Sequence, residues 1–90
     1  MEIIKDKAMV YIKDENGNMI AYATFPVNKD GYCVIDHTFV SPVLRGQGVA
    51  AKLMEKAYES IKEQGLKCLP TCSYAVLWFD KNEDKKDILA

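Results

Sequence analysis

The first forty residues predict three β-strands. Residues 8–13 are rich in strand formers, and residues 19–25 form a second such stretch, in which successive side chains lie on opposite faces. Asn16-Gly17 between them is a strong turn signal, so the two segments are expected to form a hairpin. Residues 32–40 are expected to form a third strand that ends at Ser41-Pro42, because proline cannot donate to a sheet ladder.

A long helix is predicted next. Apolar residues recur at steps of three and four over residues 49–61, and charged residues fill most of the remaining positions, which is the pattern of a helix with one buried face. Gly65 is a suitable C-terminal stop for this helix. The apolar residues of the stripe are Val49, Ala50, Leu53, Met54, Ala57, Tyr58 and Ile61.

The last third of the chain predicts a fourth strand and a short helix. Residues 66–71 are a short apolar segment, and Pro70 within it indicates a sheet edge, a bulge or a splayed strand end. Ser73 can cap a short helix that carries the apolar run of residues 75–79. The tail from Asp80 is highly charged, and Ile88-Leu89 is expected to dock back onto the core.

This order of elements predicts an α+β fold with a mixed, mostly antiparallel sheet of about four strands, one long helix and one short helix. The third and fourth strands flank the long helix, so they can form a parallel, right-handed crossover. Ninety residues predict a single domain spanning residues 1–90. A chain of this size can build only an open active site from few elements.

Composition excludes several classes of function. The formal net charge is −1 and basic residues are interleaved with acidic ones, so no field is available to attract nucleic acid or an anionic membrane. Three cysteines without dense spacing argue against a disulfide scaffold. The N-terminus has no apolar signal core, and no apolar run approaches the roughly 20 residues of a membrane span. A reducing, cytoplasmic location is therefore expected.

The candidate chemistry lies between the third strand and the long helix, in the segment Arg45-Gly46-Gln47-Gly48-Val49-Ala50. The glycines let the backbone turn tightly and let a ligand approach, and a helix start presents free N–H groups and a partial positive charge. Together with Arg45 this predicts a site for a phosphate or pyrophosphate. The segment lacks the Gly-Lys-Ser/Thr end of a P-loop and the third glycine of a dinucleotide fingerprint.

The segment resembles the signature of the GNAT acetyltransferase superfamily, Arg/Gln-x-x-Gly-x-Gly/Ala at a strand-to-helix junction. It reads Arg45-x-x-Gly48-x-Ala50 here and follows Phe39-Val40-Ser41-Pro42, which has the hydrophobic-Val-x-Pro pattern typical of that superfamily. His37-Thr38-Phe39-Val40 and Cys72-Ser73-Tyr74 resemble a short, single-domain GNAT subfamily. The resemblance covers about residues 32–79 and implies a minimal GNAT-like fold.

The resemblance also implies a cosubstrate and the residues that bind it. Acetyl-coenzyme A would be held at its pyrophosphate by backbone N–H groups of Arg45, Gly46, Gln47, Gly48, Val49 and Ala50. The backbone of Phe39 and Val40 would pair with the pantetheine arm like an added strand, and the parallel strands would splay near Pro70 to admit the thioester. Helices that longer relatives use to build the acceptor pocket are missing from this pattern.

His37 and Cys72 are the candidate catalytic residues. His37, the only histidine, could take a proton from an attacking amine, or could simply be bonded to backbone or water. Cys72 could be a nucleophile or a proton donor to the departing thiolate, or a small buried hydrophobe. Cys33 and His37 lie four apart, as do Cys68 and Cys72, so each pair is expected to share a face of its strand, and His37 and Cys72 could lie at one level of neighbouring strands.

Two further interpretations concern neighbouring residues. Tyr74 could donate a hydrogen bond to the leaving thiolate, or could pack in the core. Zinc held by Cys33, His37, Cys68 and Cys72 together fails on distance, because residues four apart on a strand are separated by about 13 Å. No metal is expected.

Three functions remain open at this stage. The first is an N-acetyltransferase-like enzyme that transfers acetyl from acetyl-coenzyme A to an unknown amine, in a protein or a small molecule. The second is an acyl-coenzyme A binding or sensing module without turnover. The third is an interaction domain in which the glycine loop is structural. Coenzyme binding separates the third from the others, and acetyl transfer separates the first two.

Overall fold

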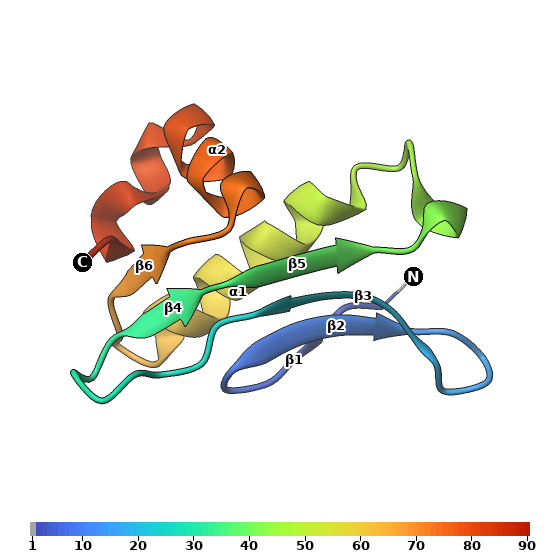
Figure 1. The fold of residues 1–90 in the computed structure, drawn as a ribbon, viewed down its shortest axis with the longest axis horizontal. Coiled ribbons are helices and arrows are strands. Elements are labelled where there is room, and N and C mark those ends of the chain that lie inside the picture. Colours follow the sequence, from blue (N-terminus) through green and yellow to red (C-terminus); the bar gives the residue numbers. More distant parts are fainter. Residues whose placement is uncertain (1) are drawn as a thin grey trace.

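The chain folds as an α+β protein, as the sequence predicts (Figure 1). The structure is a computed structural model that describes residues 2–90, so Met1 of the expected 1–90 domain lies outside the described residues. Four strands form an antiparallel sheet in the order β1-β2-β3-β5, and β4 pairs with β6 in parallel. The strands are β1 Ile4–Lys5, β2 Met9–Lys13, β3 Met19–Thr24, β4 Cys33–Ile35, β5 His37–Val40 and β6 Cys68–Pro70.

The helices begin and end close to the predicted positions. They are α1 Val49–Glu63 and α2 Ser73–Lys81, with short 3-10 helices η1 Pro42–Leu44 and η2 Glu83–Ile88. Gly65 ends α1 with a left-handed φ of 70°, which lets its N–H donate to the carbonyl of Lys62 while the N–H of Leu66 donates to that of Ile61. The predicted stop is therefore confirmed.

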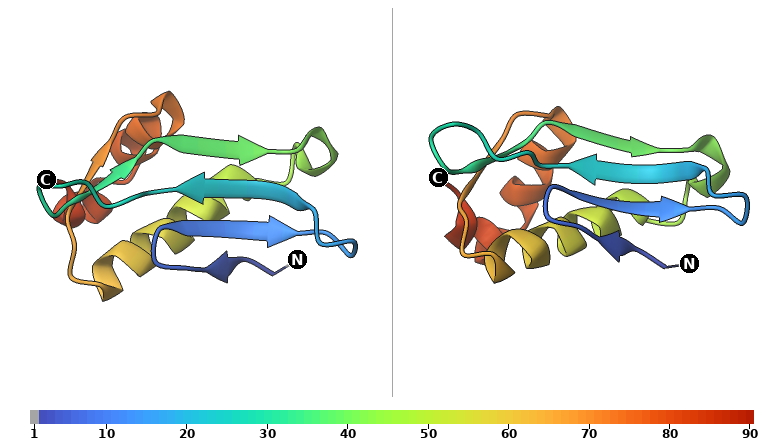
Figure 2. Two further views of the ribbon diagram at one scale, coloured as in Figure 1. Left: turned by 60° about the horizontal axis from the view of Figure 1, so that its bottom comes forward. Right: turned by 90° about the horizontal axis from the view of Figure 1, so that it is seen from below.

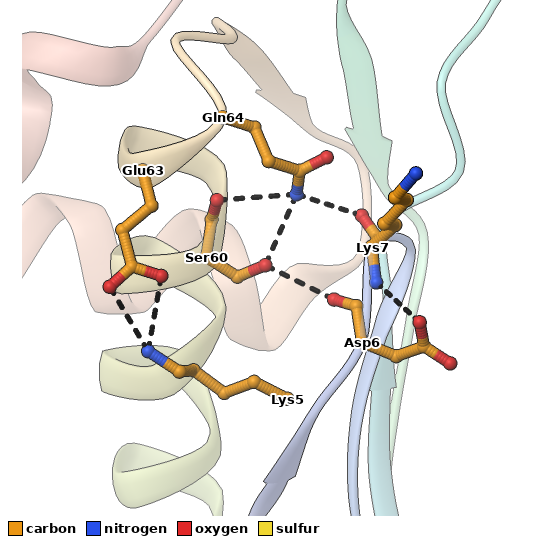
Figure 3. A pocket seen from close by; sticks show the side chains of 6 residues that line it. All are labelled: Lys5, Asp6, Lys7, Ser60, Glu63 and Gln64. Carbon is orange, nitrogen blue, oxygen red and sulfur yellow. Dashed lines mark hydrogen bonds and ion pairs between the residues drawn. The ribbon is translucent and has the colours of Figure 1, made fainter.

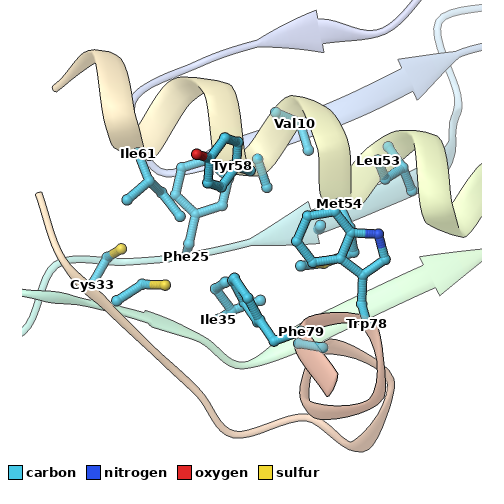
Figure 4. Packing of buried hydrophobic residues seen from close by; sticks show 14 of the residues in the cluster. Val10, Phe25, Cys33, Ile35, Leu53, Met54, Tyr58, Ile61, Trp78 and Phe79 are labelled. Carbon is cyan, nitrogen blue, oxygen red and sulfur yellow. The ribbon is translucent and has the colours of Figure 1, made fainter. Parts of the chain in front are cut away.

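The core lies between α1 and the sheet. Figure 2 shows α1 running across one face of the strands. Ala21, Ala23 and Phe25, in β3 and just after it, are fully buried in the core cluster. Trp78 and Phe79 of α2 pack edge to face, with ring centroids 5.0 Å apart (Figure 4). The largest fully buried side chains are Phe25, Phe79, Ile35, Leu53, Met54, Ile61, Val10, Cys33 and Cys68.

The third predicted strand is wrong as one continuous element, because a bulge at Asp36 divides it into β4 and β5. The N–H of Val34 donates to the carbonyl of Pro26, but His37 pairs with Thr24, so the register changes by one residue between them. The N–H of Asp36 also donates to the carbonyl of Thr24, at 3.3 Å. Asp36 and His37 thus both lie opposite Thr24, and two residues opposite one is the geometry of a β-bulge.

The predicted crossover through α1 is confirmed by the parallel pairing of β4 and β6, in which Cys33 lies opposite Cys68. The fourth strand is shorter than predicted and ends at Pro70. The charged tail returns to the core: Ile88 is buried, and the N–H of Ala90 donates to the carbonyl of Cys68. The predicted docking of the tail is therefore confirmed.

Candidate functional site

The outer edge of β5 carries free backbone donors. The N–H of Ser41 donates to the carbonyl of Ile20 at 2.8 Å, and antiparallel pairs alternate between bonded and non-bonded. The N–H groups of Phe39 and His37 therefore face β3, whereas those of Thr38 and Val40 face away from it. No strand pairs with this outer edge among residues 2–90.

The two parallel strands separate where β5 begins. The N–H groups of Thr71 and Cys72 both donate to the carbonyl of Ile35, the last residue of β4, at 2.9 and 3.2 Å. Beyond that point β5 continues toward η1, whereas the chain after Pro70 turns into α2 (Figure 1). The free donors of Thr38 and Val40 thus begin where the parallel pairing ends.

The bulge decides which side chain meets Cys72. Without it, His37 would share the inward face of Cys33 and Ile35; with it, Thr38 and Val40 face inward and are half-buried, while His37 and Phe39 face outward and are exposed. The hydroxyl oxygen of Thr38 lies 3.8 Å from Sγ of Cys72. The prediction that Cys33 and His37 share a face is wrong, and the structure does not bring His37 and Cys72 together.

The glycine loop leads from β5 into α1. Arg45 follows η1, and Gly46 and Gly48 adopt left-handed φ angles of 81° and 67°. Such angles strain any residue with a β-carbon, so glycine is required at both turns for a conformational reason. Arg45 is exposed and forms no ion pair within residues 2–90.

The start of α1 leaves backbone N–H groups without partners. The first helical bond runs from the N–H of Lys52 to the carbonyl of Gly48, so the N–H groups of Val49, Ala50 and Ala51 precede the helical ladder. Within the described chain no side chain caps this end, and its first turn contains no acidic residue. The helix dipole therefore presents an unneutralised positive end.

A cavity of about 250 Å³ joins the strand edge to this helix start. Tyr74 of α2 closes it from the other side, and burial raises the pKa of Tyr74, so its hydroxyl stays protonated at neutral pH. Leu44, Ala51 and Tyr74 were not included among the predicted binding residues. The cavity is lined by Val40, Leu44, Arg45, Gly46, Gly48, Val49, Ala50, Ala51 and Tyr74.

Cys72 differs from the other two cysteines in its surroundings. It is half-buried at the N-cap of α2, where Sγ accepts the N–H of Ala75 at 3.4 Å. Cys33 and Cys68 are fully buried, and their mutual hydrogen bond raises the pKa of Cys68 and lowers that of Cys33. Both therefore belong to the core, and Cys72 is the thiol that solvent can reach.

A second pocket, at the C-terminal end of α1, is explained by structural contacts (Figure 3). The Ser60 hydroxyl donates to the carbonyl of Asp6 at 3.1 Å, and the Gln64 amide donates to the carbonyl of Lys7 at 3.0 Å. Lys5 forms an ion pair with Glu63 at 3.2 Å. These contacts fasten the turn between β1 and β2 to α1.

Two structural features bear on metal binding and membranes. Within residues 2–90, no group of three or more His, Cys, Asp and Glu side chains is placed to hold a metal ion. No helix in the described part is both long and apolar enough to cross a bilayer.

Comparisons with known proteins show the family and the fold. A family model described as GCN5-related N-acetyl-transferase matches residues 9–88. A GCN5-like protein from Staphylococcus aureus, solved by NMR, is 34% identical, with a TM-score of 0.77, over 99% of this chain and 87% of its own. No match was found among curated proteins.

More distant solved structures share the fold alone. Glucosamine-6-phosphate N-acetyltransferase from Arabidopsis thaliana is 18% identical with a TM-score of 0.54, over 81% of this chain and 56% of its own. Ribosomal-protein-alanine N-acetyltransferase from Brucella melitensis is 19% identical with a TM-score of 0.54, over 96% of this chain and 68% of its own. The chain thus spans just over half of the first and two thirds of the second.

Proposed function

Because the chain belongs to the GCN5-related N-acetyltransferase family, we propose that it binds acetyl-coenzyme A along the free edge of β5 and transfers the acetyl group to an amine. The observation that carries this proposal is the continuity of the site. Free strand donors at Thr38 and Val40 lead toward the open N-terminus of α1, and one cavity is lined by Val40 of β5, by the glycine loop and by the first turn of α1. An extended, anionic ligand fits such a path.

The coenzyme would be held almost entirely by backbone. The pyrophosphate would lie on the N–H groups from Gly46 to Ala50, with Arg45 supplying a positive charge and bidentate donors. The pantetheine arm would bind the outward N–H groups of Val40 and Thr38, since Phe39 donates to β3. Thr38 thus replaces Phe39 in the binding set inferred from the sequence, and Gln47 and Val49 remain in it.

Acetyl transfer could follow either of two routes. In the direct route the amine nitrogen attacks the thioester carbonyl, a C–N bond forms, and the C–S bond breaks to release the coenzyme thiolate. In the covalent route Cys72 sulfur attacks first and releases the coenzyme as thiol, and the amine then takes the acetyl group and regenerates the Cys72 thiol. The protonated hydroxyl of Tyr74 would assist by donating to the leaving sulfur.

The two candidate catalytic residues would act from opposite faces of β5. Cys72 lies on the inward side with Thr38, whereas His37 projects from the outward face. An amine that approached from the open face of the sheet would meet His37, which could take the proton that the nitrogen must lose. In either route the N–H of Thr38 or Val40 would polarise the carbonyl.

An acyl-coenzyme A binding module without turnover is the second candidate. The separation of His37 from Cys72 favours it, because the two groups are not assembled as a pair. Isothermal titration with acetyl-coenzyme A tests binding, and release of free coenzyme thiol with a panel of amines tests transfer. Binding with thiol release supports the enzyme; binding without release supports the module; absence of binding refutes both.

A further inference from the structure

We propose that Thr38 is a positioning residue, whose hydroxyl donates a hydrogen bond to the sulfur of Cys72 and holds it beside the free edge of β5. This inference rests on the proposed acetyl-coenzyme A site and adds to it a side chain that the sequence pattern did not single out. It concerns the geometry of the thiol, so it applies to either route of transfer.

The direction of the hydrogen bond follows from the other neighbour of the sulfur. Sγ of Cys72 already accepts the N–H of Ala75 at 3.4 Å, at the positive end of α2. A sulfur in that position is favoured as a hydrogen-bond acceptor. The Thr38 hydroxyl oxygen lies 3.8 Å from the same sulfur, and in the proposed direction it is the donor, so that two donors converge on one sulfur atom.

Thr38 lies between the proposed thioester site and the sulfur of Cys72. The N–H of Thr38 points to the free edge, where the thioester carbonyl would bind, and its hydroxyl contacts the cysteine sulfur on the inward side. The bulge at Asp36 produces this arrangement, because without it the inward position would fall to His37. Thr38 is thus placed to align a nucleophile or proton donor with the acetyl group.

Thiol alkylation by iodoacetamide, read by mass spectrometry, tests the contact without coenzyme. Cys72 is half-buried whereas Cys33 and Cys68 are fully buried, so the reagent reports on Cys72 in the folded protein. Thr38→Val removes the hydroxyl at nearly constant shape, and Thr38→Ser retains it. Thr71→Val is the matched control, since the Thr71 hydroxyl donates to the carbonyl of Ile35 at 3.4 Å rather than to sulfur.

The expected result is a change in the pH profile. With one hydrogen-bond donor fewer, the negative charge on the reacting sulfur is less well stabilised, although a less stabilised thiolate is also a better nucleophile. Alkylation of Thr38→Val should therefore be about threefold slower than the parent at pH 7, and at alkaline pH, where thiolate nucleophilicity alone sets the rate, Thr38→Val should react as fast as the parent or faster. Thr38→Ser should restore the parent profile, and Thr71→Val should retain it.

An unchanged alkylation profile in Thr38→Val, with Thr38→Ser and Thr71→Val also unchanged, would overturn the proposal. Should Thr38→Val fail to fold, Thr38→Ala against Thr38→Ser makes the same comparison. Titration of the parent with acetyl-coenzyme A is run beside it. If the parent does not bind acetyl-coenzyme A, the proposed function is refuted, whereas the alkylation rates still decide the role of Thr38.

Discussion

Gly48 allows the proposed phosphate site to be tested against a control within the same helix. Gly48 begins α1 with φ 67° and Gly65 follows its end with φ 70°, and an added β-carbon would meet no atom within 4 Å at either position. Gly48→Ala and Gly65→Ala therefore impose the same backbone strain. They differ in place, because Gly48 lines the cavity proposed for the pyrophosphate and Gly65 does not.

The strain sets the size of the shared effect. An alanine in the left-handed region costs about 1–2 kcal/mol, and 1 kcal/mol lowers the Tm of a domain of this size by about 4–8 °C. Thermal denaturation should show both variants folded at 25 °C, with Tm lowered by about 5–15 °C. Loss of one charge-assisted hydrogen bond to phosphate corresponds to about 10–100-fold weaker binding.

Isothermal titration with acetyl-coenzyme A then separates the two variants. Gly48→Ala should bind at least about tenfold more weakly than the parent, and Gly65→Ala should bind as the parent does. Equal affinity in both variants would show that the phosphates do not approach Gly48, and the reasoning from the helix start would fail.

The remaining predictions concern catalysis and acid stability. Incubation of Cys72→Ala with acetyl-coenzyme A should give no acetyl adduct and no turnover if the covalent route operates, and a partial rate loss if the direct route does. His37→Ala should slow transfer by about 10²–10⁴-fold, as for a lost general base, and parent rates in both variants would return both residues to packing roles. Lys62 and Tyr58 donate hydrogen bonds to Asp87 that hold the pKa of its carboxyl below the ordinary value. These contacts therefore stabilise the fold fully at pH values above the ordinary pKa of Asp, and they weaken as the pH falls through the lowered pKa. Urea denaturation of Asp87→Asn should therefore show a smaller stability loss on acidification below about pH 4 than the parent; an identical loss would refute the contribution of this contact.

The parts of the fold that depend on local pattern could be predicted from the sequence. The three- and four-residue spacing of apolar side chains identified α1, and Gly65 marked its end, because a Schellman stop needs a left-handed residue. Asn16-Gly17 identified the turn between β2 and β3 for the same local reason, with φ 82° at Gly17. The two-residue strand β1 was missed, since so short an edge strand leaves no pattern of its own.

The division of the third strand could not be predicted, and this limited the prediction of the site. Residues 32–40 contain no internal glycine or proline to mark a bulge, and the extra residue at Asp36 is defined by its pairing with Thr24 across the sheet. If side chains alternate between the two faces without interruption at Asp36, His37 faces inward, whereas in the structure Thr38 does. The glycine loop was identified because its backbone requirement is local, whereas the partner of Cys72 depends on tertiary register.

Amide chemical shifts during titration of the ¹⁵N-labelled protein with acetyl-coenzyme A test whether the coenzyme binds along β5 and the start of α1. The largest shifts are expected along one path, at Thr38, Val40, Gly46, Gly48 and the first turn of α1, with little change at the opposite end of α1 around Ser60 and Gln64. Shifts that cluster around Ser60 and Gln64, or no shifts at millimolar coenzyme, would contradict it.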